Sequence, residues 1–313
     1  MWLFIKKISV FVLPVLFILF TGEVLLRAVP NDYQYKNDYL ETNAESIETL
    51  ILGTSHTYRG LNPDFFSTNT FNAAYKSQSM DIDYLIFKKF EHKFKNLKNL
   101  ILPVSYPSFI YSMENEENTR WRIFNYIIYY DLLPDYKIKN RFEILNNLPI
   151  TSFQKLKDYY LEGKSEIDCD SLGFGPNLPY QSLENLKKSG LERVNLQSYK
   201  KLKPSDYKEI FDRNTRVLDY FINYCNSNNI KLYILTPPVF YTYYENVNQE
   251  QLEVMHHTID SLTKGKENVW HIDLLEDKRF KPVDFKNADH LSKYGAKKLS
   301  LIMDSIISNN KVQ

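Results

Sequence analysis

Two groups of residues, far apart in the chain, carry the side chains that serine-based acyl transfer requires. The first is the turn Gly53-Thr54-Ser55, which directly follows an apolar, strand-like run at 49–52. The second is the pair Asp289-His290 near the C-terminus. A serine hydroxyl is a weak nucleophile at neutral pH, and it needs a histidine to take its proton and a third group to orient that histidine. The residue types therefore predict Ser55 as a nucleophile and His290 as its base.

The other histidines fit ordinary structural positions. Four of them are expected on helix surfaces or inside a strand: His92, His256, His257 and His271. His56 follows Ser55 directly, and we expect its side chain to point away from the serine hydroxyl. An alternative for the C-terminal pair is that Asp289 only caps the closing helix and that His290 has no role in chemistry.

The apolar pattern predicts an α/β protein. Short apolar runs at 48–52, 70–75, 97–104, 230–235 and 269–274 indicate strands, and apolar residues at helical spacing indicate helices over 81–95, 207–228, 249–264 and 291–309. This alternation is typical of a flavodoxin-like parallel sheet, here of about five strands, with helices on both faces. Ser55 then lies at the carboxyl end of the first strand, where open α/β sheets bind ligands.

Composition limits the classes of function. The hydrophobic content of 43% and the charged content of 25% fit a packed globular body. The formal net charge of +1 gives no indication of a nucleic-acid partner. The 24 tyrosines fit either a glycan-binding surface or a tyrosine-rich core. The two cysteines, Cys169 and Cys225, either pair or stay free, and they form no metal-ligand pattern.

The N-terminal stretch has the composition of a membrane-spanning helix. Lys6 and Lys7 precede an apolar run that continues to Leu26 and is followed by Arg27. The run has about 19 residues, close to the ~20 that a span requires. The lysines favour a cytoplasmic N-terminus and an extracytoplasmic main domain, in the periplasm or at the cell surface. A cleaved signal peptide and a buried core helix are the alternatives, but the residues after Leu26 make a poor cleavage site.

These patterns divide the chain into three parts. Residues 1–29 form the membrane anchor, 30–45 a polar linker, and 46–313 one α/β domain. Residues 109–203 interrupt the alternation of strands and helices, and we expect there an aromatic-rich, partly helical insertion. The insertion is either a lid or substrate-binding face, or a surface feature without a function.

Four blocks in this order resemble those of the SGNH hydrolases. They are Gly53-Thr54-Ser55; Phe71-Asn72-Ala73-Ala74 with Ser77-Gln78-Ser79; Leu100 to Tyr106; and Asp289-His290-Leu291-Ser292 with Gly295-Ala296. Together with the N-terminal anchor, they look most like the membrane-anchored, SGNH-like proteins of bacterial cell-envelope modification. That group contains the DltD-like teichoic-acid D-alanylation proteins and the alginate and peptidoglycan O-acetyltransferases. The resemblance implies an SGNH-type fold and covers about residues 46–108 and 205–309.

The blocks also depart from the hydrolase pattern. Thr54 replaces the usual aspartate, and Ser77 stands where the second block has glycine. The third block lacks its asparagine near Ser105. In the hydrolases an acid normally stands three residues before the histidine, and that position here is Asn287. Either Asn287 or the adjacent Asp289 is therefore expected to orient His290.

The resemblance also suggests which groups bind the substrate. Backbone N–H groups at Ser55 would form an oxyanion hole, to which Ser105 or Gln78 adds a donor, and Asn72 is a further substrate-binding candidate. The family implies a multi-pass membrane acyltransferase as the acyl-donor partner and a glycan as acceptor. No metal and no organic cofactor is expected. The expected activity is O-acetylation through an acyl-serine. Hydrolysis or deacetylation, and a catalytically inactive scaffold that binds glycan, are the alternatives.

Overall fold

The computed structural model describes residues 2–132, 137–199 and 204–309. Contacts within the chain divide it into two compact units. Unit 1 comprises Met1–Asp38 and Arg120–Asp168, and unit 2 comprises Tyr39–Thr119 and Cys169–Gln313. The residues predicted to carry chemistry all belong to unit 2.

Unit 2 is built on a parallel sheet of five strands. The strands are β1 (Thr49–Ile51), β2 (Thr70–Asn72), β3 (Asn99–Pro103), β4 (Lys231–Thr236) and β5 (Val269–Asp273). Their order is β2-β1-β3-β4-β5, and every neighbouring pair is parallel. Residues of β1 and β3 are buried throughout, as expected for strands covered on both faces. The predicted α/β class with about five strands is confirmed.

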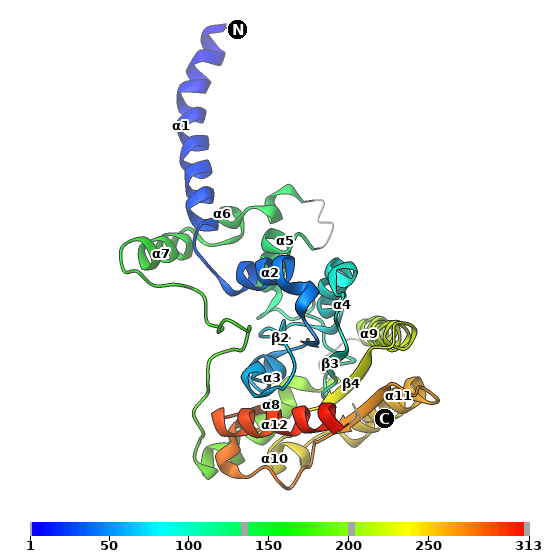
Figure 1. The fold of residues 1–313 in the computed structure, drawn as a ribbon. Coiled ribbons are helices and arrows are strands. Elements are labelled where there is room, and N and C mark those ends of the chain that lie inside the picture. The colour runs from blue at the N-terminus through cyan, green and yellow to red at the C-terminus, as the bar shows by residue number, and fades with distance from the viewer. Residues whose placement is uncertain (1, 133–136, 200–203, 310–313) are drawn as a thin grey trace. The chain divides into compact units, whose positions relative to one another are not determined.

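Helices cover both faces of this sheet. In Figure 1, α4 (Met80–Phe90), α9 (Pro204–Ser227) and α11 (Gln249–Thr263) lie on one side, and α3 (Ser55–Tyr58) and α12 (Lys293–Asn309) lie on the other. Unit 2 also contains α8 (Leu183–Gln197), α10 (Tyr241–Tyr244) and the antiparallel pair β6 (Phe285–Asn287) and β7 (His290–Leu291). Cys169 and Cys225 are both buried, and no disulfide joins them.

Unit 1 contains the N-terminal helix α1 (Trp2–Arg27). Its part Ser9–Arg27 is long and apolar enough to cross a membrane, with a mean hydropathy of 2.3. The other elements of the unit are the start of α2 (Asp32–Asn43), followed by α5 (Ile123–Tyr129), α6 (Glu143–Asn146) and α7 (Pro149–Tyr160).

Two segments differ from the expected organisation. Residues 30–45 were expected to be a linker. They contain helix α2, along which Tyr33, Lys36 and Leu40 are buried. Residues 109–203, expected to be one insertion, are divided: Arg120–Asp168 belongs to unit 1, whereas α8 packs on β6 and α10 in unit 2.

The turn after β1 is fixed by close packing and by a buried carboxyl group. Gly53 has a φ of 112°, and a Cβ atom there would lie 2.0 Å from Cγ of Pro103, so that only glycine fits. The Gly53 N–H donates to Oδ1 of Asp83 at 2.8 Å, and the Gln78 amide donates to the same oxygen at 2.6 Å. Asp83 therefore connects α4 to the turn that presents Ser55.

Replacing Asp83 tests this connection. Burial raises the pKa of Asp83 from 3.8 to about 8, so the side chain is mainly neutral at pH 7 and asparagine resembles it. Asp83→Ala leaves two buried donors without an acceptor, and we expect it to lower the free energy of unfolding by about 2–4 kcal/mol. Asp83→Asn keeps the accepting oxygen and should cost less than about 1 kcal/mol. Urea unfolding at pH 7 measures both, and equal losses would contradict the proposed connection.

Candidate active site

The structure brings Ser55 and His290 together. Ser55 Oγ lies 2.8 Å from His290 Nε2, although 235 positions separate the two residues in the sequence. Ser55 follows β1 at the start of α3, and His290 begins β7. The strand order reverses between β1 and β3, which is the place where ligands bind in sheets of this topology.

The turn around Ser55 is closed by threonine side chains. The Thr54 hydroxyl accepts the His56 N–H at 3.2 Å and so caps α3. The Thr57 hydroxyl donates to the Leu52 carbonyl at 2.8 Å. Two short polar side chains thus complete a tight connection from strand to helix, and Ser55 lies at its bend.

A hairpin presents His290. Asn287 on β6 pairs with His290 on β7, and Ala288 and Asp289 form the turn between them. The Ala288 N–H donates to Ser189 Oγ, and the Ala288 carbonyl accepts from the Phe240 N–H, at 2.9 and 2.8 Å. The hairpin is therefore fixed from both α8 and the loop before α10, where the sequence predicted only a loop.

Both candidate orienting groups reach the His290 ring. Nδ1 lies 2.9 Å from Oδ1 of Asp289 and 3.2 Å from Oδ1 of Asn287. The Asn287 oxygen also accepts the His290 backbone N–H at 2.8 Å. Asp289 carries the charge and makes the shorter ring contact, so it can stabilise an imidazolium, while Asn287 fixes the backbone. Asp284 instead accepts from the Lys281 N–H and pairs with Lys298.

Asp289 is held by two side chains of α8 that the sequence analysis did not identify. Arg193 binds it with two nitrogens, Nε to Oδ1 and Nη2 to Oδ2, both at 2.8 Å. The Gln197 amide donates to Oδ2 at 2.7 Å. Burial opposes the charge on Asp289, but His290, His56 and Arg193 outweigh this effect and hold its pKa well below the usual range. Its carboxylate is therefore ionised at neutral pH.

His56 lies on the other side of the same carboxylate. Its Nε2 is 3.6 Å from Oδ2 of Asp289, and its ring centroid is 4.9 Å from that of His290. Nε2 is buried and has no hydrogen-bond partner among the described residues. Burial lowers the pKa of His56 from 6.5, so the ring is neutral at pH 7. His56 therefore lies beside the Asp289–His290 pair, a position that the sequence did not predict.

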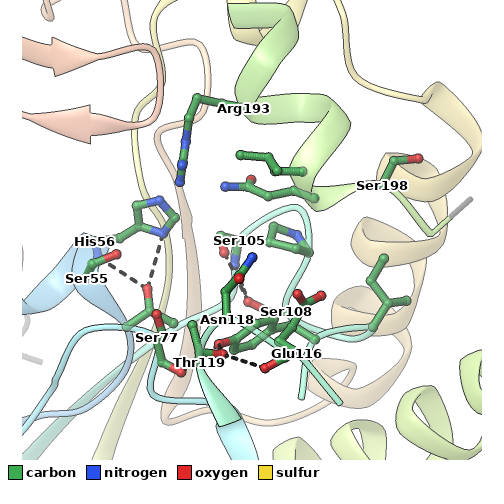
Figure 2. A pocket seen from close by; sticks show the side chains of 16 residues that line it. Ser55, His56, Ser77, Ser105, Ser108, Glu116, Asn118, Thr119, Arg193 and Ser198 are labelled. Carbon is green, nitrogen blue, oxygen red and sulfur yellow. Dashed lines mark hydrogen bonds between the residues drawn. The ribbon is translucent and has the colours of Figure 1, made fainter. Parts of the chain in front are cut away.

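A pocket of about 310 Å³ opens beside Ser55. In the view of Figure 2, Ser55, His56 and Ser77 lie at the left of the pocket and Arg193 lies above it. The rest of the lining comes from the loop after β3 and from the end of α8: Ser105, Pro107, Ser108, Ile110, Tyr111, Glu116, Asn118, Thr119, Leu196, Gln197 and Ser198, together with Thr54. Most of these side chains carry a hydroxyl, amide or carboxylate group.

Of the three predicted substrate-binding side chains, only Ser105 lines this pocket. The Asn72 amide is fully buried and donates to the carbonyls of Thr57 and Leu61, so it holds backbone rather than substrate. Gln78 is buried and binds Asp83. Both predictions are corrected, because these amides satisfy groups inside the fold that would otherwise be unpaired.

The backbone N–H groups of Ser55 and Ser77 are candidates for oxyanion donors, because both residues line the pocket. Ser77 has a φ of 60°, in the left-handed region that favours glycine, which fits its position in the second block. Within the described residues, neither the Ser55 N–H nor the Ser77 N–H is engaged in a hydrogen bond. The Ser105 N–H already donates to Ser108 Oγ, and the two serine hydroxyls lie 3.1 Å apart, so Ser105 can offer a ligand only its hydroxyl.

The same cluster contains three side chains that could bind a metal ion. Ligand atoms of His56, Asp289 and His290 lie within 4.8 Å of one another. However, both oxygens of Asp289 already accept from Arg193, and a second cation there would face the guanidinium charge. The donor set therefore fits a catalytic triad better than a metal centre.

No protein-family model matches this sequence, and no curated protein matches it. Among solved structures, the chain is similar to a Streptococcus pneumonia protein provisionally described as a platelet activating factor. The identity is 10%, the TM-score is 0.44, and the match covers 96% of this chain and 99% of the other. A provisionally described acylhydrolase from Bacteroides fragilis is similar at 11% identity, with a TM-score of 0.40 and coverage of 87% and 95%. At these TM-scores neither likeness carries an argument about activity.

Substitutions at 287 and 289 separate the two candidate orienting groups. Asp289→Asn removes the charge beside the imidazole, and we expect an ester-hydrolysis rate constant lower by about 10³–10⁴. Asn287→Ala removes neutral contacts and should lower it by about tenfold. Rates with a chromogenic acetyl ester measure both, and circular dichroism confirms folding. A larger loss in Asn287→Ala would identify Asn287 as the orienting group.

The pH dependence of stability tests the environment of His56. The groups that face this ring are Asp289, His290 and Arg193. Because the pKa of His56 is lower in the folded chain than in the unfolded chain, its contribution to stability is present above about pH 6.5 and is lost as the pH falls. The difference in urea midpoint between wild type and His56→Gln should therefore shrink between about pH 7 and pH 5. A difference that is constant over this range would contradict the assignment.

Proposed function

We propose that the chain is a serine acyl-transfer enzyme whose nucleophile is Ser55. The observation that carries this proposal is the chain of hydrogen bonds from Ser55 Oγ to His290 Nε2 and from His290 Nδ1 to Asp289 Oδ1, at 2.8 and 2.9 Å. A serine, a histidine and a buried carboxylate in this order form the arrangement that activates a hydroxyl for attack on an ester carbonyl.

The residues have the following roles in the proposed reaction. Ser55 Oγ attacks the carbonyl carbon of an acyl donor while its proton passes to His290 Nε2. Asp289 stabilises the imidazolium, and the N–H groups of Ser55 and Ser77 stabilise the oxyanion of the tetrahedral intermediate. His290 then gives the proton to the leaving oxygen, and an acyl-serine remains. An acceptor hydroxyl, activated by His290, takes the acyl group and restores Ser55.

We propose a carbohydrate hydroxyl as the acceptor. The support is the lining of the pocket, which includes the hydroxyls of Ser77, Ser105 and Ser108, the Asn118 amide and the Glu116 carboxylate. Side chains of this kind offer both donors and acceptors, which is what a polyhydroxylated ligand needs. Its volume of about 310 Å³ is at the small end of the range for ligand pockets, which favours a ligand of about the size of one acetylated sugar. Together with the sequence blocks, this favours an SGNH-like O-acetyltransferase that modifies a cell-envelope or secreted polysaccharide.

The proposed location is the outer side of a membrane. The apolar length of α1 and the order of charges, with Lys6 and Lys7 before it and Arg27 after it, favour a single span with a cytoplasmic N-terminus. An acyl donor for such an enzyme must reach the outer side, so a multi-pass membrane acyltransferase is the proposed partner.

A serine-directed phosphonate tests the nucleophile. The full chain in detergent should be labelled on Ser55, and labelling should be lost in Ser55→Ala and strongly reduced in His290→Gln. Ser198→Ala is the matched control, because Ser198 lines the same pocket but belongs neither to the proposed triad nor to the proposed oxyanion donors, and this variant should be labelled like wild type. Labelling that persists in Ser55→Ala would refute the assignment.

The acceptor is tested with a soluble acetyl ester as donor. We expect acetylated oligosaccharide to form and free acetate to fall when an envelope-type oligosaccharide is added. Release of acetate that is unchanged by the oligosaccharide would instead indicate an esterase, with water as the acceptor.

A further inference from the structure

Unit 1 exposes large apolar side chains beside the end of α1. Leu145, Leu148, Ile150 and Phe153, from α6 to α7, are between 52% and 69% exposed. Ile150 and Phe153 lie one turn apart on α7, on the same exposed face. Ser152, between them in sequence, is buried. In Figure 1, α6 and α7 lie at the C-terminal end of α1.

Contacts with α1 show where along that helix the apolar surface lies. A Cβ atom at Gly22 would lie 2.7 Å from Cδ1 of Ile144, so α6 packs closely against the helix at this point. The Tyr160 hydroxyl, at the end of α7, donates to the Leu25 carbonyl at 3.1 Å. With a helical rise of 1.5 Å per residue, Gly22 lies about 7–8 Å before Arg27 along the axis. The segment 144–160 therefore lies level with the last turns of the apolar helix.

The buried carboxylate of Glu23 also attaches α6 to α1, through hydrogen bonds. Glu23 is the only acidic residue in the apolar stretch Ser9–Arg27, and it is buried in the structure. Its carboxylate accepts the N–H groups of Glu143 and Ile144, at 3.1 and 2.9 Å, and pairs with Arg27 at 2.6 Å. A charge at the edge of a bilayer needs such partners. The start of α6 is thus bound to the last turns of α1, which hold Glu23 and Arg27.

We infer that the segment 138–161 is a membrane-interface foot that lies in the outer lipid interface beside α1, with the side chains of Leu148, Ile150 and Phe153 among the lipids. This inference rests on the proposed membrane span of α1. The contact of Ile144 with Gly22, about 7–8 Å before Arg27 along α1, lies within the ~5–10 Å to which interfacial helices insert their apolar face. An aromatic side chain such as Tyr160, with an apolar body and a polar tip, is typical of this zone. The occupant of the exposed face is therefore lipid.

A depth-dependent quenching experiment tests the membrane-interface foot. The full chain is reconstituted in vesicles of phosphatidylcholine and phosphatidylglycerol, with an environment-sensitive fluorophore on Leu148→Cys, Ile150→Cys or Phe153→Cys. Leu16→Cys, in the middle of α1, is the reference for the span. Ser165→Cys is the matched control, because Glu166 beside it binds the Pro30 carbonyl beyond the end of α1. The parent chain, whose two cysteines are buried, gives the background.

The three foot positions should show blue-shifted emission, quenching by lipids that carry a spin label near the headgroup, and protection from aqueous iodide. Ser165→Cys should be quenched by iodide, and Leu16→Cys most strongly by a label deep in the acyl chains. Foot positions that respond like Ser165→Cys, while Leu16→Cys is quenched by lipid, would refute the foot and leave the span intact. Protection from both quenchers would assign the surface to a protein contact and refute it. If Leu16→Cys is quenched by iodide and not by the lipid spin labels, both the span and the foot are refuted. Phosphonate labelling of Ser55 reports on the proposed function independently of these outcomes.

Discussion

The arrangement of the active site depends on the burial of one carboxylate. Asp289 is only 2% exposed, and a buried charge is tolerated only when partners surround it. These partners come from separate parts of the chain: His290 from the hairpin, Arg193 and Gln197 from α8, and His56 from α3. Satisfying a single acid therefore forces three segments to converge, and this convergence brings His290 to Ser55.

The sheet supplies the other half of the arrangement. Because β1 and β3 are parallel neighbours on either side of the reversal in strand order, the residues that follow them emerge at the same edge. Ser55 follows one of these strands, and Ser105 follows the other. The positions of Ser55 and Ser105 are thus consequences of topology, whereas those of His290 and Asp289 depend on the long-range pairing around the Asp289 carboxylate.

This division explains what the sequence could predict. Strand and helix periods are local, so the α/β class and the position of Ser55 after β1 followed from them, and the motif order led to His290. Arg193 was not foreseeable, because an arginine on an amphipathic helix has the same local pattern whether it meets solvent or a buried acid 96 positions away. Asn72 and Gln78 were assigned to substrate because polar residues in a motif suggest binding. The structure uses their amides to satisfy buried backbone and carboxyl groups instead.

Three of the departures from the hydrolase pattern, at Ser77, Thr54 and Asn287, have a structural counterpart. Ser77 adopts the left-handed conformation that a glycine would supply. Thr54, in place of aspartate, caps the helix that begins at Ser55. Asn287 keeps the contact to the His290 backbone, and the charge that it lacks is supplied by Asp289, one residue away from the base. Moving the acid next to the histidine places it in the hairpin turn, where Arg193 can pair with it. The amide at 287, the acid at 289 and the arginine on α8 are therefore parts of one arrangement around the His290 ring.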